Sequence, residues 1–289
     1  FISLATLNGC GGGSSHSSPV NLDADSEEQT NESPVTSTPE ISDLDRQLNA
    51  IIEGFTWDTA PLRNREIPAP TDTLAQLGMK LFFSKSLSGE FDTACASCHH
   101  PSLAGADELS LPIGTSATDE NLLGLGRTHS NGVPLVPRNS PTIFNVALWD
   151  SSLFWDSRVE SLGKENDANG SLSAVRTPDS DYLFADPNAG DNLVAAQARF
   201  PVTSVAEMKS DNFEINSTNT EIRYHLAARI GNYGIGENAL ERNEWLTEFR
   251  QAFGVSGEAE ELITFDNIAL ALGEYQRSLV FIDSPWQQY

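Results

Sequence analysis

The segment CASCHH, residues 95–100, holds two of the three cysteines and two of the five histidines of the chain. Thiols and an imidazole this close together suit a disulfide, a metal clip or a covalent cofactor. A Cys95–Cys98 disulfide fits an oxidising compartment. A structural zinc ion needs four ligands, and few partners remain. The other histidines are His16, His100, His129 and His225. A thioredoxin-type pair usually lies in a βαβ unit, which is not predicted here.

The spacing Cys95-x-x-Cys98-His99 favours a covalently attached c-type haem. On one helical turn, residues i and i+3 share a face, so both thiols can meet the vinyl groups of the haem. The histidine that follows can then direct its imidazole at the iron as the proximal ligand. The motif therefore predicts one haem c in this chain.

The sixth position of the iron decides between electron transfer and peroxide chemistry. A permanent methionine or histidine ligand suits electron transfer, and the chain has only two methionines, Met79 and Met208. Peroxide chemistry needs an open or openable position and groups that move a proton. The motif alone leaves both interpretations open.

The elements that would position this motif are mainly helices. Apolar residues recur at helical spacing in segments 43–55, 72–83, 220–233, 242–253 and 264–281. Thr264 is the expected N-cap of the last helix, and Asp266 favours the positive end of its dipole. Residues 101–140 and 163–193, rich in Gly, Pro, Asn and Asp, predict long irregular loops. The expected class is all-α, a cytochrome c-like haem domain with long irregular loops.

The net charge of the chain limits which partners it is expected to bind. Its 289 residues include 41 acidic and 17 basic ones, which gives a formal net charge of −24. Nucleic acid and anionic lipid attract basic surfaces, so neither is an expected partner. No apolar segment of about 20 residues predicts a membrane-spanning helix. The acidic surface favours a basic protein partner.

The first 42 residues predict a leader and a tether. FISLATLNGC lacks the basic start of a signal peptide, so we interpret residues 1–10 as the end of a bacterial lipoprotein signal with Cys10 as the lipidated residue. The alternative is a chance cysteine after an ordinary signal peptide. Residues 11–42 are Gly/Ser/Pro-rich and acidic, which predicts a disordered tether. The expected location is the periplasm, with a lipid anchor in a bacterial membrane, for which Gly11 favours the outer membrane.

Four blocks of the chain, in order, resemble the bacterial di-haem cytochrome c peroxidase family, which includes the MauG-like proteins. They are LGMKLFFSKSLSGEFDTACASCHHPSL, PRNSPTIFNVALWDSSLFWDSRVESL, AAQARFPVTSVAEM and FDNIALALGEYQRSLV, and the resemblance covers about residues 66–289. It implies that residues 43–289 form the N-terminal, peroxidatic haem domain, with His99 as proximal ligand. It also implies a second haem domain that is missing here, so we expect a chain truncated at both ends; a mono-haem protein is the alternative.

The resemblance assigns roles to residues outside the motif. Gln197, Pro201 and Glu207 match the distal-pocket pattern Gln-x3-Pro-x5-Glu, in which the glutamate moves a peroxide proton and the glutamine hydrogen-bonds the bound oxygen. Trp155 matches a tryptophan that relays electrons between the haems, and Asn139 matches a side-chain ligand of calcium. Without the resemblance, each has an ordinary structural explanation.

Some peroxidases of the family carry a distal histidine that binds the iron in the oxidised enzyme. His129 lies in the loop where that ligand is found, so it is a candidate for gating the oxidised iron, or else a surface histidine. His100 is expected to point away from the haem, and His225 to be structural. The 163–193 segment looks like an insertion without an assigned role.

The function implied is a periplasmic peroxidase that reduces hydrogen peroxide to water with electrons from a small cytochrome c or cupredoxin. One alternative is a MauG-like enzyme that oxidises a partner protein. The other is a non-catalytic electron-transfer cytochrome whose sixth ligand, such as His129 or Met208, never leaves. Peroxide reduction needs two electrons, and in the family the second haem supplies one of them. This chain alone is therefore predicted to reduce peroxide slowly with an external donor. The resemblance is compatible with a homodimer.

Overall fold

The computed structural model describes residues 42–54 and 61–283. They belong to two units, residues 1–57 and residues 58–289, and each is described by itself. In the first unit, α1 (Asp43–Glu53) begins with a capping box. Ser42 Oγ accepts from the Asp45 N–H, and the Asp45 carboxylate accepts from the Ser42 N–H, both at 3.1 Å. The helix predicted over 43–55 is confirmed up to Glu53. Phe55, Cys10 and the segments predicted as leader and tether, up to residue 41, lie outside the described residues.

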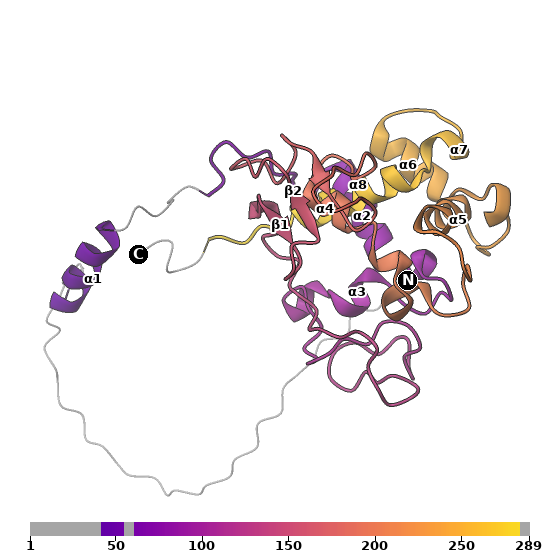
Figure 1. Cartoon of the computed structure of the whole chain (residues 1–289), viewed down its shortest axis with the longest axis horizontal. Helices are drawn as coiled ribbons and strands as arrows, with labels where there is room; N and C mark the ends of the chain where they lie inside the picture. Colours follow the sequence, from indigo (N-terminus) through magenta and orange to yellow (C-terminus); the bar gives the residue numbers. More distant parts are fainter. Residues whose placement is uncertain (1–41, 55–60, 284–289) are drawn as a thin grey trace, which may run out of the picture. The chain divides into compact units, whose positions relative to one another are not determined.

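The second unit is built mainly from helices (Figure 1). Its α-helices are α2 (Thr73–Phe83), α3 (Cys95–Cys98), α4 (Leu193–Gln197), α5 (Asn219–Gly231), α6 (Trp245–Phe253), α7 (Ala259–Leu262) and α8 (Phe265–Arg277). Short single turns are η1 (Lys85–Leu87), η2 (Pro101–Leu103), η3 (Val146–Leu148), η4 (Pro201–Thr203), η5 (Val205–Lys209) and η6 (Gly234–Gly236). The helices predicted over 72–83, 220–233, 242–253 and 264–281 are all confirmed, with some ends shifted. Thr264 caps α8 as predicted, because its side chain accepts from the Asn267 N–H at 3.2 Å.

Helix α8 is the centre of the packing. Helices α2, α4 and α5 all contact it, and Figure 1 shows α2 and α4 grouped with it. Ile268 and Leu272 of α8 and Leu81 of α2 are fully buried in one core cluster. Each such side chain contributes about 1.5–3 kcal/mol of transfer free energy. The apolar spacing that predicts these helices therefore also predicts the core.

Two glycines let backbones meet directly at α8. A Cβ added to Gly78 of α2 would lie 1.8 Å from the Ala271 carbonyl oxygen. A Cβ added to Gly273 of α8 would lie 2.9 Å from the Ala195 nitrogen of α4. The close approach of α2 and α4 to α8 therefore requires the absence of a side chain at both positions.

A small antiparallel sheet is the departure from the predicted all-α class. The strands β1 (Ser152–Leu153), β2 (Val159–Ser161) and β3 (Val175–Arg176) lie in the order β1-β2-β3, with Glu160 opposite both Ser152 and Arg176. Strands of two or three residues are too short to give an alternating apolar pattern, so the sequence does not predict them. The fold is mainly helical with a minor sheet. Within the described residues, no helix is long and apolar enough to cross a membrane.

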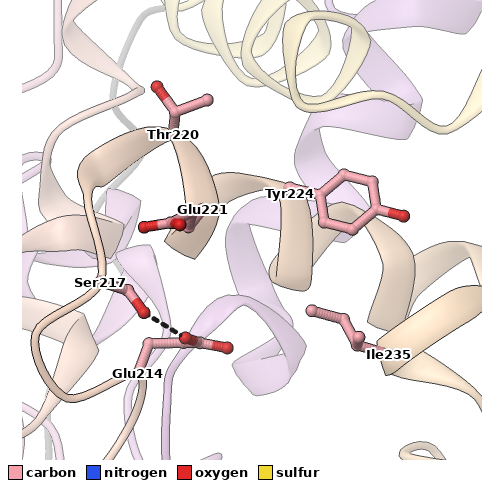
Figure 2. Close-up of a pocket in the computed structure, with 6 residues that line it drawn as sticks. All are labelled: Glu214, Ser217, Thr220, Glu221, Tyr224 and Ile235. Atoms are coloured by element: carbon pink, nitrogen blue, oxygen red, sulfur yellow. Dashed lines mark hydrogen bonds between the residues drawn. The ribbon is translucent and has the colours of Figure 1, made fainter.

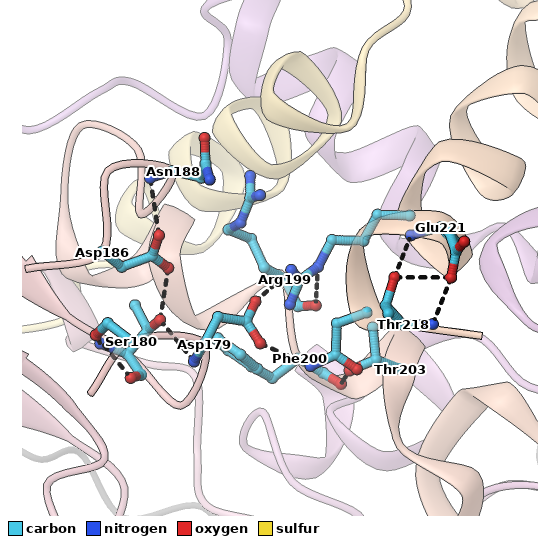
Figure 3. A network of polar contacts seen from close by, with 12 residues as sticks. Asp179, Ser180, Asp186, Asn188, Arg199, Phe200, Thr203, Thr218 and Glu221 are labelled. Carbon is cyan, nitrogen blue, oxygen red and sulfur yellow. Dashed lines mark hydrogen bonds and ion pairs between the residues drawn. The ribbon is translucent and has the colours of Figure 1, made fainter. Parts of the chain in front are cut away.

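The segment 163–193 is held to the helices by polar contacts (Figure 3). Asp179 pairs with Arg223 of α5 and accepts from Asn219 Nδ2 at 2.7 Å. Asn192 then caps α4, accepting from two backbone N–H groups at 2.9 and 3.0 Å. The predicted loop therefore enters α4 from a fixed direction, although it contains little regular structure.

Candidate haem-binding site

The CASCHH segment forms a single helical turn with His99 directly after it. Helix α3 carries Cys95 and Cys98 at its two ends, and both are free cysteines. Ser97 Oγ accepts from the Ala94 N–H at 3.0 Å and so closes the start of the turn. His99 has left helical geometry, with φ −132° and ψ 49°, while its N–H still donates to the Cys95 carbonyl at 3.0 Å. Cys95 and Cys98 therefore lie one turn apart on the same face of α3, as expected, and His99 lies at the bend that follows.

Hydrogen bonds at Nδ1 fix the ring of His99. Nδ1 lies 2.9 Å from the Pro141 carbonyl oxygen and 3.3 Å from that of Gly105, so it carries the proton and donates. Burial lowers the pKa of His99, which keeps the ring neutral at neutral pH. Metal-binding histidines have this arrangement, with one nitrogen donating to a carbonyl and the lone pair on the other. The two free thiols and this tautomer fit a covalently attached haem.

The thiol of Cys98 lies against the loop at residues 113–115. Its Sγ is 3.7 Å from the Ile113 carbonyl oxygen, and the next residue, Gly114, contacts the backbone of Glu207. Burial raises the pKa of Cys98 to about 12; Asp107 and Glu207 raise it as well, whereas Arg127 lowers it. The turn that carries Glu207 therefore packs against the same loop as the attachment motif.

Glu207 is held by the loop at residues 113–115. It lies in η5, a π-helical turn of a kind common at functional sites. Thr115 Oγ1 donates to the Val205 carbonyl at 3.0 Å, and the Thr115 N–H donates to the Ala206 carbonyl at 3.3 Å. A Cβ added to Gly114 would lie 2.8 Å from Glu207 Cα. The two backbones are therefore in direct contact, which fixes where the Glu207 side chain starts.

The surroundings of Glu207 favour its protonated form. Burial raises the pKa of Glu207, and Arg158 acts in the opposite direction. Arg158 is held by Asp156, with Nε 2.9 Å from Oδ1, and its guanidinium lies 4.7 Å from the centre of the Phe154 ring. A carboxyl whose pKa lies closer to neutrality than usual can both accept and return a proton.

Gln197 and Pro201 lie on the short elements that lead to η5. Gln197 is the half-buried last residue of α4, and Pro201 begins η4, which packs against η5. Arg199, between them, pairs with Asp266 at the start of α8, and its carbonyl accepts from Arg223 Nε at 2.9 Å. These contacts fix the path from Gln197 to Glu207. Asp266 therefore does more than complement the helix dipole.

Trp155 and Asn139 lie at the surface. The Trp155 side chain is exposed, and the guanidinium of Arg138 stacks 4.4 Å from the centre of its ring. Asn139 is exposed and donates from Nδ2 to the Leu109 carbonyl at 2.6 Å. In the part of the chain that the structure describes, no group of three or more His, Cys, Asp or Glu side chains could hold a metal ion. The calcium role of Asn139 therefore rests on the resemblance.

His129 is buried, with 5% of its surface exposed. Its Nδ1 accepts from the Asn131 N–H at 3.1 Å. Nε2 is buried and has no hydrogen-bond partner among the described residues. A histidine that binds iron through Nε2 carries its ring proton on Nδ1, so the hydrogen bond from Asn131 must break before His129 could become a ligand.

The other two histidines among the described residues, His100 and His225, contact neighbouring side chains. His100 Nδ1 accepts from the Ser102 N–H at 3.2 Å, and its ring packs edge-on against Phe83. His225 pairs with Glu214 and lies against the ring of Phe213.

Sequence reasoning missed Arg127, the buried cation beside the motif. Its guanidinium donates only to backbone carbonyls, which include Ile113 at 2.9 Å and Gly114 at 3.1 Å. It therefore shapes the loop that holds Glu207. It lies in an irregular stretch without periodicity, so no pattern in the sequence identifies it.

A pocket of about 450 Å³ lies apart from these residues, on α5 and the turns beside it (Figure 2). It is lined by Glu214, Ser217, Thr220, Glu221, Tyr224 and Ile235. Its two carboxylates are already engaged: Glu214 accepts from Ser217 Oγ at 2.5 Å, and Glu221 accepts from the Thr218 N–H at 2.7 Å. None of the predicted functional residues lines it.

Comparison with known proteins gives a consistent result. The family described as di-haem cytochrome c peroxidase matches residues 72–289. Cytochrome c551 peroxidase of Pseudomonas aeruginosa is 26% identical over 246 residues, covering 85% of this chain and 49% of that protein. The methylamine utilization protein MauG of Methylorubrum extorquens is 27% identical over 232 residues, covering 78% of this chain and 45% of that protein. The chain spans about half the length of these two relatives.

Among solved structures, a MauG-like protein associated with microbial copper homeostasis aligns with a TM-score of 0.44 and 22% identity. The alignment covers 81% of this chain and 49% of that one.

Proposed function

Because the chain belongs to the di-haem cytochrome c peroxidase family, we propose that it reduces hydrogen peroxide to water in a cytochrome c-like haem domain formed by residues 43–289. Cys95 and Cys98 would hold the haem covalently, and His99 would be its proximal ligand. When bound, the haem would supply the redox chemistry that passes electrons to peroxide. The observation that carries the proposal is the single helical turn that holds Cys95 and Cys98 with His99 directly after it, and the turn of Glu207 packed against the loop that Cys98 contacts.

Glu207 would move the proton. Its carboxylate takes the proton from one peroxide oxygen and delivers it to the other, which departs as water when the O–O bond breaks. Two electrons and two further protons complete the reduction to two waters. Gln197 would hydrogen-bond the peroxide and orient it, while Pro201 keeps the backbone between the two residues in its turn.

The electrons would come from a small cytochrome c or cupredoxin. A net charge of −24 attracts a basic donor, so we expect the rate with that donor to fall steeply as salt is added. Trp155 would relay electrons between a second haem and the haem of this domain, and Asn139 would bind calcium nearby. Cys10 would anchor the protein by a lipid to a bacterial membrane, facing the periplasm, with residues 11–42 as the tether. A homodimer belongs to the same proposal and is tested by its mass in solution.

A MauG-like activity, oxidation of a partner protein, is the second candidate, because MauG itself is among the relatives. It would use the same pocket with a different source of electrons. The electron-transfer alternative is disfavoured by its candidate ligands. Met208 is packed into the main core cluster with 3% exposed, and Nδ1 of His129 accepts a hydrogen bond that iron binding through Nε2 would break.

The proposal is tested by Glu207→Gln in the haem-loaded protein. We expect the rate constant for the reaction with peroxide, followed by stopped-flow absorbance, to fall by about 10²–10⁴-fold, because the amide cannot accept the proton. Glu214→Gln is the control, since Glu214 is bound by Ser217 and His225 away from the motif. A full rate in the Glu207 variant would overturn the proposal. A low-spin spectrum that peroxide leaves unchanged in the parent protein would favour electron transfer.

A further inference from the structure

Arg229, on the last turn of α5, is a buried cation that the function proposed above does not use. Only 3% of its surface is exposed. Its guanidinium lies between two aromatic rings, 4.3 Å from the centre of Phe91 and 4.7 Å from that of Phe213. Burial lowers the pKa of Arg229 to about 10, with Glu90 acting in the opposite direction, so the group is charged at neutral pH. Burying a charge is costly unless hydrogen bonds or an opposite charge compensate it.

What Arg229 holds is the backbone of residues 86–89. Its NH1 donates to the Ser88 carbonyl at 2.6 Å and to the Ser86 carbonyl at 3.3 Å, and NH2 donates to the Gly89 carbonyl at 3.3 Å. The fork of a guanidinium can serve three carbonyls at once, which an ammonium group cannot do in the same geometry. Arg229 therefore fixes the shape of this loop.

The same loop lies directly against the turn that carries Glu207. The Gly89 N–H donates to the Met208 carbonyl at 2.8 Å. A Cβ on Gly89 would lie 1.9 Å from the Lys209 carbonyl oxygen and 2.6 Å from Phe213 Cβ, so there is no room for a side chain. A shift of residues 88–89 must therefore shift η5.

The loop also leads to the attachment motif. Ser88 Oγ donates to Asp92 Oδ1 at 2.7 Å, and Asp92 Oδ2 accepts from the Ser116 N–H at 2.8 Å. Thr93 Oγ1 donates to the Gly114 carbonyl at 2.9 Å, and Gly114 is the residue in contact with Glu207 from the other side. Residues 88–93 thus join Glu207 to the chain that enters α3 at Cys95.

We infer that Arg229 is a positioning residue of the peroxide site: by binding the carbonyls of residues 86–89 it sets η5, and with it Glu207, at a fixed place relative to the haem-attachment helix. The inference rests on the function proposed above, because it gives Arg229 its effect through Glu207.

The test is a double-mutant cycle between Arg229→Met and Glu207→Gln in the haem-loaded protein. Arg229→Met keeps an unbranched chain and removes every donor. We expect it to lower the rate constant with peroxide by roughly ten- to hundred-fold, the size of effect that a displacement of about 1 Å produces. In the Glu207→Gln background, the same substitution should change the residual rate by less than about two-fold, because the interaction it supports is gone.

A second measurement needs no peroxide. Amide hydrogen exchange over residues 203–210 should become faster in Arg229→Met, because the partner of the Met208 carbonyl is no longer held. Arg229→Lys, which keeps the charge but not the fork, should lie between the parent and Arg229→Met in both measurements. The matched control is Arg250→Met. Arg250 lies on α6, and its Nε donates to the Gly257 carbonyl at 2.9 Å. This substitution should leave both measurements unchanged.

The outcomes separate the two proposals. An equal loss of rate from Arg229→Met with and without Glu207 would overturn the positioning role, since it would reflect a general structural defect. A full rate in Glu207→Gln alone would overturn the proposed function instead. If Arg229→Met does not accumulate as a haem protein, Arg229→Lys is carried through the same cycle and judged by the same criterion.

Discussion

Replacing Gly114 by alanine tests directly whether the placement of Glu207 matters. The added Cβ would lie 2.3 Å from the Ala206 carbonyl oxygen and 2.4 Å from that of Glu207. Carbon atoms are essentially never found within 3.0 Å of such a neighbour, so the two backbones must separate by about 0.7 Å. Both oxygens belong to the backbone, so no side-chain rotation can relieve the clash. Overpacking of this kind costs about 1–3 kcal/mol of stability.

We expect Gly114→Ala to fold and to attach haem, but to react with peroxide roughly ten- to hundred-fold more slowly. Stopped-flow absorbance gives the rate, and thermal unfolding of the same sample gives the loss of stability. Gly257→Ala is the matched control, because a Cβ there meets nothing closer than 3.8 Å. A Gly114→Ala protein that is destabilised and yet reacts at the parent rate would refute the argument that η5 must stay in place.

Three further predictions follow from the described contacts. The pKa of Glu207 is raised from its ordinary 4.5, so the folded state keeps this proton to higher pH than the unfolded state and loses stability as pH rises through that range. Glu207→Gln should therefore unfold at a higher temperature than the parent at pH 7.5, with no gain at pH 4; an equal difference at both pH values would contradict this. Asp179→Ala leaves Arg223 buried without its carboxylate and should cost about 3 kcal/mol in chemical denaturation, whereas Arg242→Ala, from an exposed pair, should cost less than about 0.5 kcal/mol. His129→Gln should leave the visible spectrum of the oxidised haem protein unchanged, because iron binding through Nε2 would break the hydrogen bond from the Asn131 N–H to Nδ1; conversion from a low-spin to a high-spin spectrum would show that His129 is an iron ligand after all.

The long helices were predictable because each shows its apolar side at regular spacing. Ile268 and Leu272 recur at the interval that α8 needs, and Thr264 marks where it starts. The short elements gave no such signal. Helix α4 has five residues and follows a loop, and β1 to β3 have two or three residues each, so their conformation depends on contacts with distant parts of the chain.

The attachment motif was predictable from spacing alone, since Cys95, Cys98 and His99 lie within one turn. Glu207 could be singled out only by resemblance, because a single glutamate in an acidic chain has no distinguishing pattern. The position of Arg229 in the sequence is unusual: it follows Ile222 and Leu226 on the apolar side of a predicted helix, where charged residues are rare unless they are paired. What it binds could not be predicted, because carbonyls 140 residues away carry no sequence signal.

The missing side chains at Gly78 and Gly273 have a consequence for how this protein can diverge. Each is the point at which α8 touches a neighbouring helix backbone to backbone, α2 at one and α4 at the other. Helix α2 leads toward Cys95 and Cys98, and α4 ends at Gln197. The close contacts that α8 makes with α2 at Gly78 and with α4 at Gly273 therefore set the spacing between these two parts of the candidate site. Among descendants of this sequence, a single methyl group at either glycine would be selected against.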